Sequence, residues 1–185
     1  MRVKIALCII SSLLALLTFW RTSSAPSADA QPQNPPQQNQ PQYLGPTKLA
    51  ATKDGKTLYV LCEDSKQVAV VDPGAGKPTA FWSLPGQPTG LCLSPDQNRL
   101  YVTCAKPQGA VCVLELPGGK LVQEIPVGYW ACGPSVSPDG AKLYVCNRFQ
   151  NSISVVDLAA GKEVARIPAV REPIASAITP DGKTL

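Results

Sequence analysis

Histidine is absent from this 185-residue sequence. Without histidine these residues cannot form a Ser-His or Cys-His nucleophile pair, and they lack the commonest protein ligand of transition metals. A covalently bound c-type haem needs a Cys-x-x-Cys-His motif, so these residues cannot carry one. The absence therefore excludes several classes of hydrolase and haem protein for this stretch of chain.

The cysteines show no Cys-x-x-Cys spacing, which argues against zinc and iron–sulfur sites. Six of the seven lie beyond the N-terminal segment: Cys62, Cys92, Cys104, Cys112, Cys132 and Cys146. We expect most of these to be small buried hydrophobic side chains. Cys104 and Cys112 flank one predicted hairpin loop and are the best candidates for a disulfide. We predict no metal site, no cofactor and no catalytic residue.

The charge of the chain is concentrated at its N-terminus. The sequence has 17 basic and 13 acidic residues, and three of the basic ones, Arg2, Lys4 and Arg21, precede residue 26. The remainder is nearly neutral and has no clustered Lys and Arg, so we expect no nucleic-acid partner.

The first 25 residues have the pattern of an export signal. Two basic residues precede an apolar run at 5–20, and small residues follow at Ser23–Ala25. We predict a signal peptide over 1–25, with cleavage after Ala30 as the other option. The alternative is an uncleaved anchor, which would be the only contact with a membrane. We expect the protein to be exported, to the periplasm, the cell surface or the medium.

Residues 26–43 are rich in Pro, Gln and Asn and contain little that could enter a core. Such a composition cannot bury enough apolar area to offset the entropy of ordering. We predict a semi-extended linker.

The rest of the chain repeats one motif, in which an aspartate turn is followed by an apolar strand. The turn aspartates Asp54, Asp96, Asp139 and Asp181 are 42, 43 and 42 residues apart. A fixed period of this length is typical of repeat architectures. Each unit holds four short segments rich in Val, Leu, Ile and Tyr between Gly, Pro and Asp clusters, which predicts four antiparallel strands. The fold class is therefore all-β, and each unit is one blade of a β-propeller.

The motifs Ser94-Pro95-Asp96…Leu100-Tyr101-Val102-Thr103-Cys104 and Ser137-Pro138-Asp139-Gly140…Leu143-Tyr144-Val145-Cys146-Asn147 resemble the YVTN β-propeller repeat. Cys62 and Cys104 stand where that repeat usually has asparagine, and Asn147 keeps it. The resemblance covers residues 44–185, with repeats at 45–86, 87–129, 130–172 and 173–185. It implies an exported bacterial or archaeal propeller, commonly of seven blades. We therefore expect an N-terminal fragment, an open arc of three blades with the start of a fourth.

Residues that repeat in register are interpreted as structural, because a ligand does not share the symmetry of the ring. The turn aspartates serve the turns, and the tyrosines pack between blades: Tyr59, Tyr101 and Tyr144. Side chains that break the repeat cluster in the loops after the second and fourth strands, which emerge on one face. We predict a binding surface there, made of Tyr129, Trp130, Arg148, Phe149, Arg171 and Glu172.

Two functions remain open from the sequence. The first is a non-catalytic binding or scaffold module for a protein or cell-surface ligand. The alternative is a lactonase-like or other hydrolytic propeller that uses channel-lining carboxylates. An enzyme of that kind should place two non-repeating carboxylates within about 5–6 Å of each other at the channel mouth, near enough to share a metal ion or to perturb each other's pKa.

Overall fold

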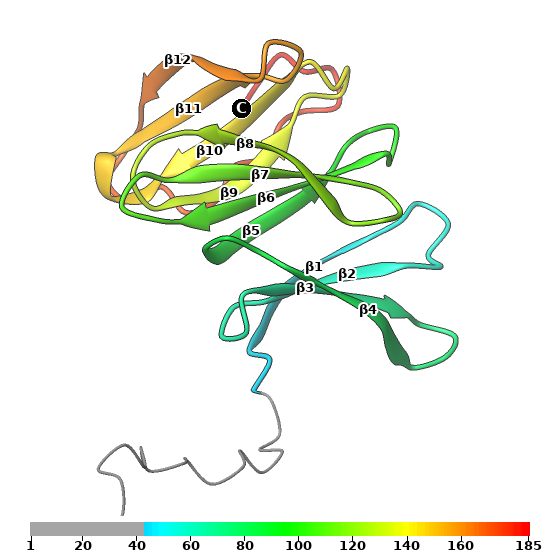
Figure 1. Ribbon diagram of the computed structural model, residues 1–185. Helices are drawn as coiled ribbons and strands as arrows, with labels where there is room; N and C mark the ends of the chain where they lie inside the picture. The colour runs from blue at the N-terminus through cyan, green and yellow to red at the C-terminus, as the bar shows by residue number, and fades with distance from the viewer. Residues whose placement is uncertain (1–42) are drawn as a thin grey trace, which may run out of the picture. The chain divides into compact units, whose positions relative to one another are not determined.

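The computed structural model describes residues 43–185, so the predicted signal segment and nearly all of the linker lie outside the described residues. The described part consists of three four-stranded antiparallel sheets, which follow one another along the chain (Figure 1). Sheet 1 contains β1 (Pro46–Ala51), β2 (Leu58–Cys62), β3 (Gln67–Asp72) and β4 (Lys77–Ser83). Sheet 2 contains β5 (Gln87–Leu93), β6 (Arg99–Ala105), β7 (Ala110–Glu115) and β8 (Lys120–Pro126). Sheet 3 contains β9 (Ala131–Val136), β10 (Lys142–Asn147), β11 (Ser152–Asp157) and β12 (Lys162–Pro168).

Each sheet is a simple meander in which sequential strands pair as neighbours. Strand β6, for example, pairs with β5 on one side and with β7 on the other, in antiparallel register. The all-β prediction and the four-stranded blade are confirmed, and the three blades form an open arc. A single turn of 3-10 helix, Arg148–Gln150, interrupts the pattern between β10 and β11.

An aspartate turn connects the first strand of each blade to the second. In sheet 3 the Ser137 hydroxyl donates to Asp139 Oδ1 at 2.5 Å, and the Ala141 amide donates to the same oxygen at 3.0 Å. These hydrogen bonds lower the pKa of the Asp139 carboxyl, the hydroxyl being the larger cause. Gly140 follows with a φ of +73°, which glycine adopts without steric cost. The turn is thus specified by residues adjacent in sequence.

Two apolar cores lie between neighbouring sheets. One joins sheets 1 and 2 around Leu61, Val102 and Leu114, and the other joins sheets 2 and 3 around Ile125 and Val145. Of the repeated tyrosines, Tyr59 lies in the first core and Tyr101 in the second, whereas Tyr144 is half-buried. Burial of this apolar surface between blades is the main favourable contribution to the fold.

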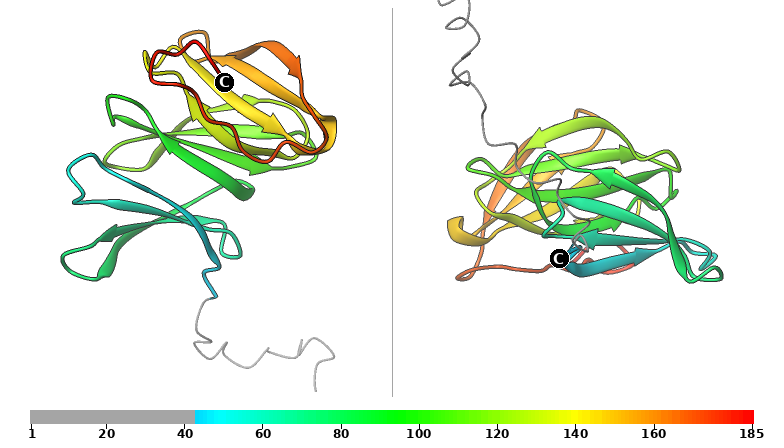
Figure 2. Two further views of the ribbon diagram at one scale, coloured as in Figure 1. Left: turned by 180° about the vertical axis from the view of Figure 1, so that it is seen from behind. Right: turned by 60° about the horizontal axis from the view of Figure 1, so that its bottom comes forward.

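Residues 173–185 run beside sheet 3 without forming a further strand (Figure 2, red). The Ser135 hydroxyl on β9 donates to the Ser176 carbonyl at 2.7 Å. The aspartate turn is nevertheless formed, since the Thr179 amide donates to the Thr184 carbonyl at 2.9 Å. Across residues 43–185, no helix is both long and apolar enough to cross a membrane.

Candidate functional site

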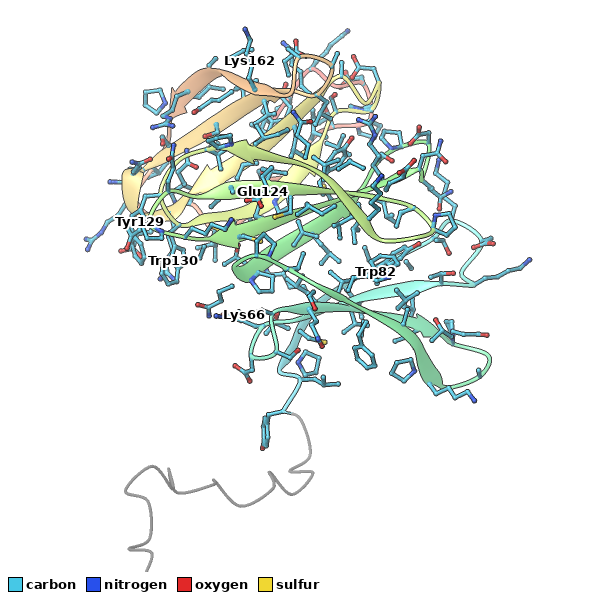
Figure 3. All side chains as sticks on the ribbon, viewed as in Figure 1. Lys66, Trp82, Glu124, Tyr129, Trp130 and Lys162 are labelled. Carbon is cyan, nitrogen blue, oxygen red and sulfur yellow. The ribbon has the colours of Figure 1, made fainter. Side chains whose placement is uncertain are left out.

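The loops predicted to share one face do meet at one end of the blades, which we call the loop end. It holds the β2–β3, β6–β7 and β10–β11 loops together with the connections from one blade to the next. The β2–β3 loop of sheet 1 contacts the start of sheet 2, where Gln87 Nε2 donates to Glu63 Oε1 at 2.7 Å. Tyr129 and Trp130 lie side by side, on the same side of the molecule as Lys66 (Figure 3). The opposite end carries the aspartate turns.

Three rings that break the repeat form one aromatic cluster at the loop end: Tyr129, Trp130 and Phe149. The ring centroids of Trp130 and Phe149 are 5.3 Å apart, and those of Tyr129 and Phe149 are 5.9 Å apart. The third pair, Tyr129 and Trp130, meets edge to face at 6.2 Å. These spacings are typical of favourable aromatic contacts. Tyr129 is 40% exposed and Phe149 47%, so the cluster presents apolar ring surface to solvent.

Arg148 links the aromatic cluster to an acidic side chain. Its guanidinium lies 5.0 Å from the centroid of the Phe149 ring, within the range of a cation–π interaction. Its Nε and Nη2 both donate to Glu172 Oε2, at 3.3 and 3.1 Å. Because the guanidinium contacts both the Phe149 ring and the Glu172 carboxylate, its charge is held beside the rings. Arg171, in contrast, is 88% exposed and approaches Glu172 only at 3.9 Å, so it lies at the edge of this surface.

Backbone hydrogen bonds hold the loops that carry the cluster. Trp130 has a φ of +54°, and its carbonyl accepts from the Arg148 amide at 3.3 Å. The Tyr129 amide donates to Gln150 Oε1 at 3.0 Å. Asn151 adopts the left-handed conformation and its Oδ1 accepts from the Glu172 amide at 2.9 Å. Polar contacts among the β8–β9 connection, the β10–β11 loop and the segment after β12 therefore fix the positions from which the rings project.

A buried polar group beside the β8–β9 connection was not singled out as a site residue by the sequence pattern. Asn147 is fully buried, and its Nδ2 donates to the hydroxyls of Ser152 and Ser154 at 3.1 and 2.8 Å. Its Oδ1 finds no partner among residues 43–185. A Cβ on Gly128 would collide with the Asn147 amide, so this glycine allows the loop to lie against it. The only available signal was that Asn147 alone keeps the asparagine of the repeat.

Three acidic side chains in and near the loop end are each engaged by a neighbouring donor. Glu172 accepts from Arg148, Glu63 from Gln87, and Glu124 forms an ion pair with Lys106 at 2.6 Å. Within the described residues, no group of three or more Cys, Asp and Glu side chains is arranged to hold a metal ion. At the other end, a cavity of about 760 Å³ lies between sheets 2 and 3, and its lining includes the turn aspartates Asp96 and Asp139 together with Arg99 and Glu115.

The two cysteines predicted as a disulfide pair lie close together in sheet 2. Cys104 and Cys112 are free thiols in the structure, with their sulfur atoms 3.5 Å apart. The bridge between them remains a prediction. The other cysteines of the described part are buried except Cys92, which is half-buried.

Comparison with known proteins supports the fold. No family model matches this chain, and no curated protein does. Among solved structures the chain is similar to hydrazine synthase of Kuenenia stuttgartiensis, with a TM-score of 0.72 and 30% identity over 77% of this chain. It is also similar to 6-phosphogluconolactonase-like proteins of Bacteroides fragilis and Bacteroides uniformis, with TM-scores of 0.63 and 0.61 and identities of 22% and 21% over 72% and 73% of this chain.

These solved structures are considerably longer than this chain. The matched region covers 41% of the hydrazine synthase chain, and 41% and 44% of the two 6-phosphogluconolactonase-like chains. The matches therefore establish that the described residues adopt a propeller-like fold. The finer resemblance to the YVTN repeat remains a prediction from the sequence.

Proposed function

We propose that this chain is a non-catalytic binding module of an exported protein, and that it binds a protein or cell-surface ligand through its loop end. The observation that carries the proposal is the exposed aromatic cluster with Arg148 held beside it. Aromatic and arginine side chains supply most of the strong contacts in protein interfaces, where they are enriched at the centre.

Two features support a role of the cluster in binding a ligand and not only in packing within the protein. The rings lie at positions that break the repeat, since Gly86 stands in sheet 2 where sheet 3 has Tyr129. The rings are also held by contacts with one another and with Arg148, and that rigidity lowers the entropy cost of binding. The cluster thus combines exposed apolar area with little side-chain freedom to lose.

The alternative is a hydrolytic, lactonase-like function, and two of the similar structures are named as lactonases. Those proteins are 22% and 21% identical to this chain, so the likeness extends to the fold alone. A hydrolytic site of the expected kind would need neighbouring carboxylates free to act together. The carboxylates of Glu63, Glu124 and Glu172 are instead each engaged by a donor, which supports the binding function.

The test compares retention of labelled full-length chain on intact cells and envelope fragments of the source organism. The variant Tyr129→Ala/Phe149→Ala removes the two most exposed rings of the cluster. Phe81→Ala is the matched control, because Phe81 is also 47% exposed but lies on outer strand β4. We expect the double variant to reduce affinity by about tenfold or more, as loss of a hot spot does, and the control to bind as the wild type does.

Equal retention of the double variant and the wild type would contradict the proposed binding surface. Hydrolysis of a sugar lactone is measured in parallel with the same three proteins. Turnover well above the uncatalysed rate, unchanged in the double variant, would favour the hydrolytic alternative.

A further inference from the structure

Cys104 and Cys112 form the one pair of thiols in residues 43–185 whose sulfur atoms are in contact, at 3.5 Å. Cys104 pairs across the ladder with Ala110, and Cys112 pairs with Val102, so the two cysteines are diagonal neighbours on one face of sheet 2. Both side chains are completely buried in the core between sheets 1 and 2. A short hairpin loop joins their strands.

The same two positions are filled differently in the other blades. Sheet 3 has Asn147 and Ser154 there, and the amide of Asn147 donates to the Ser154 hydroxyl at 2.8 Å. Sheet 1 has Cys62 and Ala69, which leaves a single thiol. The fold therefore does not require two cysteines at these positions. Sheet 2 places two sulfur atoms where sheet 3 places a hydrogen-bonded polar pair.

The remaining cysteines are directed elsewhere. Cys132 and Cys146 are register partners on β9 and β10, but the Cys132 thiol donates to the Pro173 carbonyl at 3.7 Å. Burial raises the pKa of Cys132 to about 11 and that of Cys92 to about 12, which disfavours their thiolates. The Cys62 thiol faces the Val60 carbonyl at 3.7 Å.

The surroundings of the pair favour a thiolate on Cys104. The hydrogen bond from the Cys112 thiol lowers the pKa of Cys104, and the nearby Lys106 ammonium acts in the same direction. The same sulfur–sulfur contact raises the pKa of Cys112. The thiolate is the reactive form of cysteine, so Cys104 is the better nucleophile of the two.

An ion pair that is partly open to solvent lies next to the two cysteines. Glu124 lies opposite Cys112 in the ladder and is ion-paired with Lys106 at 2.6 Å. The side chains of this ion pair are 40% and 27% exposed. The stem of Lys106 lies against Gly86, where a Cβ would be 3.0 Å from Lys106 Cγ. An ion pair exposed to this degree contributes little to stability, so it can open without unfolding the blade.

We propose that Cys104 and Cys112 are a redox pair that closes a disulfide between β6 and β7 in an oxidising compartment. The oxidant is a disulfide, either low-molecular-weight or in an exported thiol–disulfide oxidase. The Cys104 thiolate attacks one sulfur of that disulfide, forms a mixed disulfide and releases one thiolate, which takes up a proton. Cys112 then loses its proton and attacks Cys104 Sγ, which forms the intramolecular bond and releases the second thiolate. Two protein thiols are oxidised and one external disulfide is reduced to two thiols.

The test uses the full chain equilibrated in glutathione buffers that range from reducing to oxidising. Samples are quenched with acid, unfolded and labelled with N-ethylmaleimide, and the peptides are mapped by mass spectrometry. We expect the Cys104 and Cys112 peptides to lose both labels together and to appear as one linked species lighter by two hydrogens. The Cys132→Ser/Cys146→Ser variant is the matched control and should form the same linkage.

Two single variants test the assigned roles. In Cys112→Ser the mixed disulfide has no resolving thiol, so a glutathione adduct should accumulate on Cys104. Cys104→Ser should acquire little adduct on Cys112. Full labelling of both cysteines in the most oxidising buffer, or a linkage mapped to another pair, would overturn the proposal. The wild-type mapping decides this even where a variant folds poorly, and it does not depend on the proposed binding function.

Discussion

The Thr89 hydroxyl on β5 lies 2.5 Å from the Ala131 carbonyl on β9, so a side chain of one blade hydrogen-bonds to the inner strand of the next. The same relation recurs one blade later, where the Cys132 thiol donates to the Pro173 carbonyl at 3.7 Å. Cys132 occupies the position of Thr89 in the following repeat. These side-chain bonds connect the inner strands in addition to the apolar cores between the sheets.

Thr89→Val should destabilise the protein by about 1–3 kcal/mol, because the buried Ala131 carbonyl would lose its hydroxyl partner at nearly constant side-chain volume. Thr89→Ser retains a hydroxyl and should lose less stability. Urea unfolding followed by circular dichroism measures both variants. A Thr89→Val variant as stable as the wild type would show that this contact contributes nothing to the joining of the blades.

Gly90→Ala should also weaken the junction between sheets 2 and 3. A Cβ at Gly90 would lie 2.6 Å from Pro134 Cδ and 3.1 Å from the Gly133 amide nitrogen, so β5 and β9 would have to separate. Overpacking of this kind costs about 1–3 kcal/mol. The control is Gly118→Ala, where a Cβ would meet nothing within 4 Å. We expect a lower thermal midpoint for Gly90→Ala alone, and equal midpoints would contradict the close approach.

Gln97 stands where the other aspartate turns have glycine, and it has a φ of +61°. Its Oε1 accepts from the Lys53 amide of the neighbouring blade at 2.7 Å, which offsets the strain of that conformation. Gln97→Gly loses the hydrogen bond but removes the strain, so we expect a change within about 1 kcal/mol. Gln97→Ala keeps the strain and loses the hydrogen bond, so it should be the less stable variant by about 1 kcal/mol.

Gly55→Ala measures the free-energy cost of placing a Cβ on a residue with positive φ in the same kind of turn. Gly55 has a φ of +68° and a Cβ there would meet nothing within 4 Å, so only the backbone conformation is penalised. Chemical denaturation of the three variants in one buffer gives the comparison. Because both Gln97 variants lose the hydrogen bond, a Gln97→Gly variant no more stable than Gln97→Ala would contradict the backbone strain assigned to this turn.

The aspartate turns should make stability depend on pH in the acid range. Hydrogen bonds lower the pKa of Asp54, Asp96, Asp139 and Asp181 in the folded protein, the side-chain hydroxyl being the largest cause in each. A carboxyl whose pKa is lower when folded stabilises the protein above its unfolded pKa of about 3.9. That contribution disappears as the pH falls through the folded pKa.

The thermal midpoint of the wild type should therefore fall as the pH is lowered from 5 to below about 4. Asp139→Asn cannot ionise, so its midpoint should fall less steeply over the same range. Ser137→Ala removes the hydroxyl that donates to Asp139 and should reduce the slope in the same way. Parallel curves for all three proteins would contradict a role of this carboxylate in the pH dependence.

The sheets could be predicted because the signals for them are local. Ser137 and Asp139 are two residues apart and bond to each other, and Gly140 follows directly. Such a turn needs no distant partner, and its recurrence at a fixed period places the strands on either side of it. The four-stranded blades in residues 43–185 follow from that spacing.

Only part of the candidate site could be predicted from the sequence. Tyr129, Trp130 and Phe149 could be selected because they break the repeat, but their mutual contact depends on how two loops from different positions fold back. Nothing in the sequence distinguished Arg148, which lies over Phe149 and is bonded to Glu172, from Arg171, which extends to solvent. The buried Asn147 beneath Gly128 was likewise outside the predicted site.

The sequence by itself determined the all-β class, the repeat period and the turns, because each depends on residues close together in the chain. The tertiary structure alone decided which repeat-breaking side chains meet at the loop end. It also decided which cysteines come into contact: Cys104 and Cys112 are brought to 3.5 Å by the register of β6 and β7. Register and loop packing join residues that are separated in sequence, and local spacing does not specify such contacts.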